Sequence, residues 1–427
     1  MDKKRITTLF LIVLADMMGG SAIIPILPVF VVGQFHASPL QAALVITAFY
    51  VAQVLASPVL GSLSDRFGRR PILLISQAGT IFSYLLIVLA VPLGVLLAHA
   101  GLQMGIAGGL IIIYLARLLD GVTGGNISVA QAYASDISTP EERTRVLGLV
   151  GGASGVGHIL GPALAGLLAT ISLLAPFQGA AVVSGVTLLL TLLWLREPHR
   201  RAEVVDKEAT KSEKVPLSSI LRSRPVMLIL SIVLLMGLYM AALFGTFGLY
   251  VDRVLLPGQP EKVVVGTVGV IITVIGLVTA LVQVVLLKPV VSHLGEHKAV
   301  LLGCALLLVS AVGFFILSSL WAFIAFLVVF AFGTGIISPT LQSLLTRSGS
   351  EQMAGQLLGW YQSMFSLSLI LGPVLGGWLF EAAAPQAVFA GSAGLMVLAL
   401  VLSIGMQRLP LAAPPQNAQV ELGSMHH

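Results

Sequence analysis

A short charged stretch, GSLSDRFGRR at residues 61–70, separates two long apolar runs at 40–60 and 72–97. It holds one acid and three arginines, which cannot lie in hydrocarbon, so the chain leaves a membrane and enters it again at this point. Its first glycine favours a turn. Taken alone, the stretch predicts a basic loop on the cytoplasmic side of a membrane.

The composition of the whole chain indicates a membrane protein. Of the 427 residues, 57% are hydrophobic and 10% are charged, and the mean hydropathy is +1.01. A soluble domain carries about 25% charged residues, so a soluble protein and a large catalytic domain outside the membrane are both excluded. The basic residues lie between apolar runs rather than along one face, so nucleic acid is not an expected partner. The single cysteine, Cys304, excludes an intrachain disulfide and a multi-cysteine metal site.

Twelve apolar runs are long enough to cross a bilayer, since one span needs about 20 residues. The predicted spans are 6–32, 40–60, 72–97, 106–134, 144–169, 177–195, 225–250, 263–287, 299–318, 320–345, 355–380 and 386–406. The first run is too long for the apolar part of a secretory signal, so we interpret it as a retained span.

A polar run at 196–224 divides these spans into two sets of six and predicts a cytoplasmic linker. We therefore expect six-helix bundles at 1–195 and 225–409, and a disordered tail at 410–427. With the N-terminus inside, 20 of the 23 Lys and Arg residues lie on the cytoplasmic side. Both termini are then cytoplasmic in a multi-pass protein of the plasma membrane, which in a bacterium is the inner membrane.

The two halves repeat each other. At a shift of 211 residues, GPALAG at 161–166 meets GPVLGG at 372–377, and at a shift of 227 Gly68 meets Gly295. The first shift also pairs Gly124 with Gly335, Gln131 with Gln342, and Gly148 with Gly359. Parallel repeats joined by a polar linker predict a site between the two halves, near the middle of the membrane.

Three further segments accompany the charged stretch. They are DMMG at 16–19 followed by PILP at 25–28, RLLDG at 117–121, and GHILGPALAG at 157–166. With residues 61–70, they resemble the major facilitator superfamily over nearly the whole chain, most closely its twelve-span drug/proton antiporters of the tetracycline/proton antiporter group. The resemblance implies an all-α membrane protein with the major facilitator fold, in which 12 transmembrane helices form two pseudo-symmetric six-helix bundles.

In that family the charged stretch acts as a conformational lock. The resemblance implies that Asp65 docks on the N-terminus of the eleventh helix and pairs with Arg69 and Asp136, stabilising the outward-open state. A helix N-terminus carries partial positive charge, which suits an acid. The predicted lock residues are Gly61, Asp65, Arg66, Gly68, Arg69, Arg70 and Asp136. In the second half Ser292, Glu296 and His297 replace the charged pattern, so only one half can hold the full lock.

The fifth span resembles the antiporter signature of the superfamily through Gly157, Gly161, Pro162 and Gly166. Glycines let helices approach closely and proline can bend a helix, so the segment is suited to packing and rocking. Simple helix contact explains the glycines equally well, and only the resemblance favours export over import.

Asp16 lies about 15 Å into the first span by helical rise, near the middle of the bilayer. A charge there is costly unless it faces a wet cavity or a partner. We interpret Asp16 as a proton carrier, a partner for a cationic substrate, or both. The alternative is a fixed hydrogen bond between helices.

Arg117 and Asp120 are three residues apart, hence on one helical face and within pairing distance. The pair could be a structural clamp, or a switch if protonation of Asp120 frees the arginine. The resemblance implies a role in proton transfer for Arg117, whereas an acid at Asp120 departs from the tetracycline group.

In this fold the central cavity is expected between spans one, four, seven and ten. The substrate-binding candidates are Asp16, Asn126, Gln131, Tyr239, Phe244, Phe247, Tyr250 and Gln342. Few of them are charged, which favours an apolar or weakly cationic substrate. Ser83 and Thr279 stand where the tetracycline group carries titratable residues, so tetracycline itself is not the expected substrate.

The sequence therefore predicts a secondary active transporter that exports small amphipathic molecules in exchange for protons by alternating access. We expect no enzymatic activity, no cofactor besides the proton gradient and no metal, because no P-loop, His/Cys cluster or nucleophilic triad appears. The expected partners are the substrate, protons and the lipid bilayer, and we expect a monomer. The alternatives are a lipid or lysolipid translocator, a proton/solute symporter and a non-transporting membrane sensor.

Overall fold

The computed structural model describes residues 3–99, 105–124, 126–197, 223–349 and 353–407. Within these residues the fold is entirely helical, and 12 helical segments are long and apolar enough to span a membrane. The core of the predicted linker and the predicted tail lie outside the described residues, so their expected states stay predictions.

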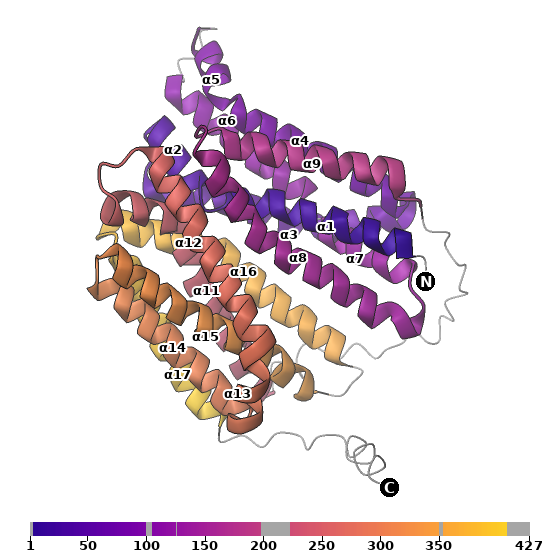
Figure 1. Cartoon of the computed structure of the whole chain (residues 1–427), viewed down its shortest axis with the longest axis vertical. Helices are drawn as coiled ribbons and strands as arrows, with labels where there is room; N and C mark the ends of the chain where they lie inside the picture. Colours follow the sequence, from indigo (N-terminus) through magenta and orange to yellow (C-terminus); the bar gives the residue numbers. More distant parts are fainter. Residues whose placement is uncertain (1–2, 100–104, 125, 198–222, 350–352, 408–427) are drawn as a thin grey trace.

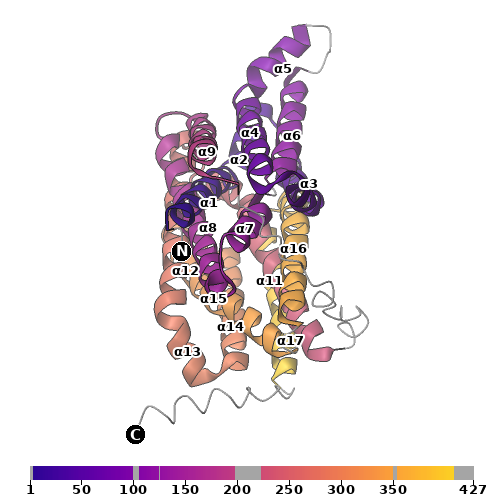
Figure 2. The ribbon, with the colours of Figure 1, turned by 90° about the vertical axis from the view of Figure 1, so that its right-hand side faces the viewer.

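The first bundle contains α1 to α9 (Figure 1). Its helices are α1 (Lys3–Ile23), α2 (Leu27–Phe35), α3 (Pro39–Phe67), α4 (Arg69–Val88), α5 (Ala90–His99), α6 (Gly105–Thr123), α7 (Asn126–Asp136), α8 (Pro140–Ala169) and α9 (Ala175–Trp194). Figure 2 shows α5 projecting from the end of this bundle, beyond the other helices.

The second bundle contains α11 to α17. Its helices are α11 (Arg224–Tyr250), α12 (Glu261–Leu281), α13 (Leu287–Leu294), α14 (Glu296–Ile316), α15 (Leu320–Arg347), α16 (Ala354–Ala382) and α17 (Ala387–Met406). Short π-helical turns follow α11 at Val251–Leu255 and α12 at Val282–Leu286.

Three predicted spans are each divided into two helices. The third, at 72–97, divides into α4 and α5 at Leu89. The first divides into α1 and α2 at Pro25, because proline lacks the backbone donor that a continuous helix needs. The fourth divides into α6 and α7 after Thr123. Side chains of neighbouring helices satisfy carbonyls at this break: Ser76 donates to the Thr123 carbonyl, and Gln53 Nε2 lies 3.1 Å from the Gly124 carbonyl.

The charged stretch is mostly helix rather than loop. Helix α3 passes through Pro58 and continues to Phe67, because no residue of 61–67 is a proline or has a positive φ. Gly68 then turns the chain with a φ of 101°, and α4 begins at Arg69. Gly295, the glycine matched by the repeat, turns the chain between α13 and α14 with a φ of 76°. A positive φ is readily adopted only by glycine, so both turns require it.

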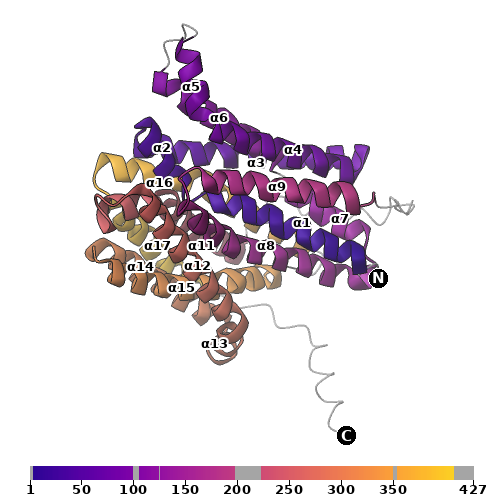
Figure 3. The same cartoon turned by 45° about the horizontal axis from the view of Figure 1, so that its top comes forward.

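The two bundles pack their helices in the same pattern. In the first bundle α1 packs against α8 and α9, and α4 packs against α9; in the second, α11 packs against α16 and α17, and α14 packs against α17. These pairs correspond in chain order, as the repeat predicts. The bundles form two layers, with α1, α3, α4, α8 and α9 in one and α11 to α17 in the other (Figure 3).

The bundles meet at one end and separate at the other (Figure 1). We call the end with Lys3, Phe67 and Met406 the terminus side, and the end with Phe35 and Ala382 the far side. On the far side α3 packs against α16 and α8 against α12. The Thr47 hydroxyl donates to the Ile370 carbonyl at 3.1 Å, across the two bundles.

On the terminus side the same two pairs of helices separate. Leu55 and Val59 of α3 are 70% and 54% exposed. A Cβ added at Gly151 of α8 or at Gly359 of α16 would meet no atom within 4 Å. The structure is therefore open toward the terminus side and closed on the far side.

Candidate functional site

Asp16 lies on α1 in the first bundle, and its side chain is half-buried. Glycines of α8 hold this helix close. A Cβ at Gly157 would lie 2.7 Å from the Met17 Cβ, and the Gly157 carbonyl accepts a hydrogen bond from the Ser21 hydroxyl at 3.1 Å. Gly161 packs against α1 near Ser21 as well. Two glycines of the predicted antiporter signature thus position the helix that carries Asp16.

Gly166 has a different neighbour. It faces Gly269 of α12 in the second bundle, so that a Cβ at Gly166 would lie 2.9 Å from the Gly269 Cα. Gly377, its match in the repeat, likewise crosses to α3, where an added Cβ would lie 2.7 Å from the Ala43 Cβ. These two glycines lie where the bundles touch, and both contacts must part if the far side opens.

Arg117 and Asp120 form an ion pair inside the first bundle. Arg117 Nη1 lies 2.6 Å from Asp120 Oδ2, and the two side chains are 2% and 4% exposed. They are the only charged side chains fully buried among the residues described. A pair without water must be well bonded, since removing one partner would leave an uncompensated buried charge.

The surroundings of the pair supply further polar and aromatic contacts. The Arg117 guanidinium lies over the Phe49 ring at 4.5 Å from its centroid, a favourable cation–π geometry. Thr80 lies beside the Asp120 carboxylate and 3.3 Å from the Thr123 hydroxyl. Arg117 Nε is buried without a hydrogen-bond partner in the described part of the chain. The guanidinium therefore keeps a donor that another acceptor could use.

Tyr84 lies in the same region as this pair and Asp16. Its buried ring lies within electrostatic reach of Asp16, Arg117 and Asp120 at once. The structure thus gathers the three residues predicted for proton coupling into one region, between α1, α4 and α6. Tyr84 was not among the predicted residues, because it lies in the third span, which was not expected to line the central cavity.

The predicted lock residues of the first bundle come together at the terminus side. Arg69 Nη1 lies 2.7 Å from Asp65 Oδ1, and Arg69 Nε lies 2.8 Å from Asp136 Oδ2. Asp65 remains 64% exposed on its side chain. Gly61 has open space around it, since an added Cβ would meet no atom within 4 Å. The docking of Asp65 on α16 stays a prediction for a state closed on this side.

The other two lock arginines have separate neighbours. Arg66 lies over the ring of Phe67, and Arg70 donates from Nη2 to the Leu192 carbonyl of α9 at 2.7 Å. Arg70 thus ties α4 to the end of the first bundle rather than to the second bundle.

Glu197 is a member of this cluster that the sequence analysis did not identify. Its Oε1 accepts from the Arg69 backbone N–H at 2.7 Å, and its Oε2 accepts from that of Arg70 at 2.9 Å. A carboxylate at these positions caps the N-terminus of α4 and complements its dipole. The available signal was topological: Glu197 is the first acid after the sixth span, on the side where α4 begins.

The second bundle carries a related pair of opposite polarity. Glu296 begins α14 as Arg69 begins α4, and Arg347 ends α15 as Asp136 ends α7. Arg347 Nη2 lies 3.7 Å from Glu296 Oε1, which also accepts from the Ser343 hydroxyl at 2.7 Å. The repeat places Glu296 where the first half has the lock residue Arg69, but no pattern in the sequence predicts Arg347 as its partner.

All four aromatic substrate candidates lie on α11 in the second bundle. Tyr239, Phe247 and Tyr250 are buried, and the Tyr239 hydroxyl lies 2.9 Å from the Ser310 Oγ. Phe244 is partly buried against Phe330, with ring centroids 6.2 Å apart. In this conformation these rings form packing contacts, so a role in substrate binding stays a prediction.

The polar substrate candidates differ from the aromatic ones. Gln131 of α7 and Gln342 of α15 are both exposed. The Asn126 side chain lies outside the described residues. Ser83, which stands at a titratable position of the tetracycline group, is fully buried and donates to the Ala116 carbonyl at 2.6 Å.

Comparisons with known proteins agree with this architecture. The family model described as the Major Facilitator Superfamily matches residues 9–259 and 261–424. The class C tetracycline resistance protein of Escherichia coli is 31% identical over 380 residues, which cover 86% of this chain and 88% of that protein. Multidrug resistance protein 1 of Bacillus subtilis is 27% identical and covers 89% of this chain and 91% of its own length. A crystal structure of a mutant of the nucleoside transporter NupG has a TM-score of 0.74 at 11% identity, over 94% of this chain and 99% of that one.

Proposed function

Because this chain belongs to the Major Facilitator Superfamily and is a membrane transporter, we propose that it exports small amphipathic molecules in exchange for protons. Its named relatives are tetracycline and multidrug resistance proteins, which supports a drug-like substrate class and outward transport. In this proposal the terminus side is the cytoplasmic side, as the distribution of Lys and Arg predicts.

The observation that carries the proposal is the cluster of ionisable groups inside the first bundle. Asp16 is half-buried in the membrane span, and the buried Arg117–Asp120 pair lies with it around Tyr84. Charges at this depth are costly and are retained where they do chemistry or carry ions. The second bundle buries no charged side chain among its described residues. Proton coupling is therefore assigned to the first bundle.

The open terminus side supports the first step of the cycle. A substrate enters from the cytoplasm and displaces a proton from Asp16. Arg117 has a free N–H donor at Nε, so its guanidinium can shift toward Asp16 when Asp16 becomes ionised. Asp120 stays paired with Nη1 of the same guanidinium. The bundles then rock, the terminus side closes, and Asp65 docks on the N-terminus of α16.

The second half of the cycle opens the far side. The Gly166–Gly269 contact and its counterpart at Gly377 part, and the substrate leaves. A proton from outside then binds Asp16 and resets the carrier. Glycine suits these contacts because two flat helix surfaces can close and separate without side chains that interlock.

The apolar character of the second bundle supports an amphipathic substrate. Its aromatic rings offer dispersion and ring contacts, and Gln131 and Gln342 offer hydrogen bonds without charge. A cationic group on the substrate would find its partner in Asp16. Ser83 is buried and hydrogen-bonded, and it stands where the resemblance would place a titratable residue in the tetracycline group. We therefore do not propose tetracycline itself as the substrate.

The test is transport in proteoliposomes whose interior is acidic. Protons leaving the vesicles should drive uptake of fluorescent amphipathic cations, and a pH-sensitive dye should report the matching proton loss. Asp16→Asn should reduce both signals to those of empty liposomes. Ser392→Ala is the matched control, because Ser392 bonds only within α17, to the Val388 carbonyl.

Other outcomes would identify the alternatives. Uptake driven by an inward proton gradient would identify a symporter. Competition by long-chain lipids alone would identify a lipid or lysolipid translocator. Absence of proton flux with every compound tested would favour a sensor, and full coupled transport by Asp16→Asn would refute the assignment of that residue.

A further inference from the structure

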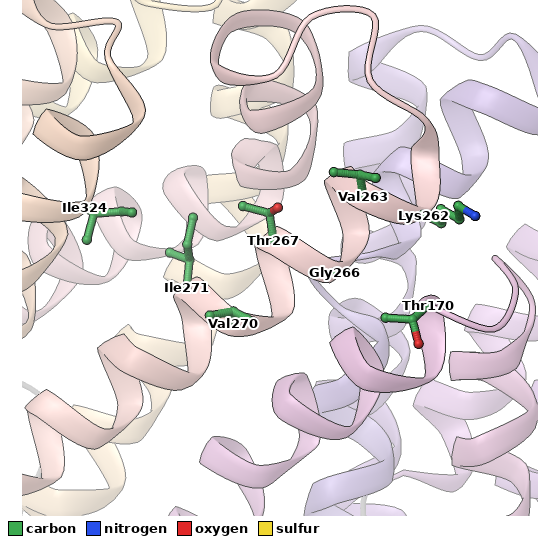
Figure 4. Close-up of a pocket in the computed structure, with 8 residues that line it drawn as sticks. All are labelled: Thr170, Lys262, Val263, Gly266, Thr267, Val270, Ile271 and Ile324. Atoms are coloured by element: carbon green, nitrogen blue, oxygen red, sulfur yellow. The ribbon is translucent and has the colours of Figure 1, made fainter.

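A groove of about 530 Å³ opens on the surface of the molecule beside the first turns of α12 (Figure 4). It lies beside α12, and its lining residues are Thr170, Lys262, Val263, Gly266, Thr267, Val270, Ile271 and Ile324. Thr170 comes from the first bundle, at the end of α8, and the others come from the second. The groove therefore lies at the seam between the bundles, outside the candidate coupling site.

The groove continues along α12 as a narrower, purely apolar channel. This second part has a volume of about 70 Å³ and shares Val270, Ile271 and Ile324 with the first. From Lys262 to Ile275 the helix rises about 20 Å. That length is more than half of a hydrocarbon core of about 30 Å, so the two parts together reach toward the middle of the membrane.

The open end of the groove is polar and positively charged. The Lys262 side chain is exposed, and Thr170 and Thr267 add two hydroxyls. Across the described residues, no carboxylate lies within 4.0 Å of the Lys262 ammonium. The carboxylate of its neighbour Glu261 lies against α2, beside Gly33. Lys262 is thus an exposed cation that has no ion-pair partner among the described residues.

We propose that this groove binds one anionic phospholipid from the leaflet on the far side. Its phosphate head group pairs with Lys262 and accepts a hydrogen bond from the Thr267 hydroxyl, and an acyl chain lies against Val270, Ile271 and Ile324. Thr170 contacts the head group without donating to it, because its hydroxyl donates to the Leu167 carbonyl at 2.7 Å. A cation above an apolar channel of this length matches the charge and the shape of such a lipid. A zwitterionic lipid fills the channel equally well but gains less at Lys262.

The position of the groove gives the lipid an effect on conformation. Gly266 lines the groove, and the Gly166–Gly269 contact lies one helical turn further along α12. Thr170 and Lys262 belong to different bundles, so their separation changes when the far side opens. A lipid held between them favours the state in which the far side is closed.

The experiment is native mass spectrometry of the whole protein released from nanodiscs of phosphatidylcholine and phosphatidylglycerol. The parent should retain one phosphatidylglycerol in preference to phosphatidylcholine. Lys262→Gln should lower that preference about fivefold, the value of one basic residue near a membrane surface. Val270→Trp, which fills the channel, should reduce retention of both lipids.

Arg253→Gln is the matched control, because Arg253 is the other basic residue expected on this side and its guanidinium lies over the Phe380 ring instead. An equal loss in Arg253→Gln would overturn the site in favour of general surface charge. No preference in the parent, or an unchanged preference in Lys262→Gln, would also overturn it. Lys262→Arg should keep the preference, and thermal unfolding of each variant separates loss of the lipid from loss of the fold. None of these readouts requires transport, so they stand apart from the proposed function.

Discussion

The two bundles share a helix-packing pattern but differ in where they bury charge. The first bundle encloses Arg117 and Asp120 and holds Asp16 half-buried beside them. The second encloses a cluster of aromatic rings, such as Phe323 stacked on Tyr250 with centroids 5.3 Å apart. One packing pattern can therefore support a titratable interior in one copy and a rigid apolar interior in the other. Under the proposed function, the first bundle carries proton coupling and the second supplies most of the substrate contact.

The sharpest test of this division is to remove one charge of the buried pair. Arg117→Gln leaves Asp120 ionised in an apolar interior, so we expect a loss of about 3–5 kcal/mol in unfolding free energy and no coupled transport. The measurement is thermal and denaturant unfolding in detergent, together with the proton-flux assay. Arg117→Gln combined with Asp120→Asn should recover most of the stability but not the coupling. If the single variant is as stable as the parent, the pair is not isolated from water.

Gly166 and Gly377, the glycines at the two contacts between the bundles, test whether both contacts respond alike to a larger side chain. Gly166→Val and Gly377→Val each overfill a contact between bundles, which should cost the far-side-closed state about 1–3 kcal/mol. Spin labels at Ser62→Cys and Gly359→Cys should then report a shorter distance, because the terminus side closes. The single native cysteine, Cys304, is fully buried and does not compete for the label. A shift in only one of the two variants would show that the seams are not equivalent.

The ion pairs of Arg69 in the first bundle should contribute more to stability than the ion pair of Arg347 in the second. Arg69 contacts two carboxylates within 2.8 Å, whereas Arg347 is 57% exposed and 3.7 Å from its partner. Arg69→Gln should lower the unfolding free energy by about 1–2 kcal/mol and slow transport. Arg347→Gln should cost at most about 0.5 kcal/mol, the usual value of an exposed pair. Equal effects in unfolding and transport assays would remove this contrast between the bundles.

A comparably small effect is expected for the Glu197 cap on α4, which has no counterpart at α14 among the described residues. Glu197→Gln keeps the shape of the side chain and removes its charge from the N-terminus of α4. The expected loss is about 0.5 kcal/mol, and it should shrink at high salt because the interaction is solvent-exposed. Chemical unfolding at low and high salt measures it. A loss that does not depend on salt would assign the effect to hydrogen bonding alone.

Much of the fold could be predicted from the sequence, because the membrane imposes strong rules. Apolar length predicts the spans, and the match of 161–166 with 372–377 predicts equivalent packing, which Gly166 and Gly377 display. The family resemblance brought Asp65, Arg69 and Asp136 together around Asp65, whereas in the structure Arg69 is the residue that contacts both carboxylates, since two acids repel each other. These features depend on local pattern or on a motif.

Other features depend on three-dimensional context that no local pattern contains. The charged stretch at 61–70 was predicted as a loop, but its residues continue α3 until Gly68 allows a positive φ. Tyr84 acquires its position only when α1, α4 and α6 pack together. Glu197 and Arg347 find their partners across long sequence separations. The open terminus side is a property of the balance between states, which composition does not encode.

Gly68 and Gly295 have a consequence for the ancestry of the chain. If the two halves descend from one duplicated segment, both descendants kept the left-handed turn, while the acid and base around it exchanged places. The backbone conformation of the turn was then conserved more strictly than the charges of the side chains around it. A reconstructed ancestor of one segment that keeps this glycine turn should still assemble two copies into the same two-bundle fold. It should do so whether the base or the acid of the ion pair follows the turn.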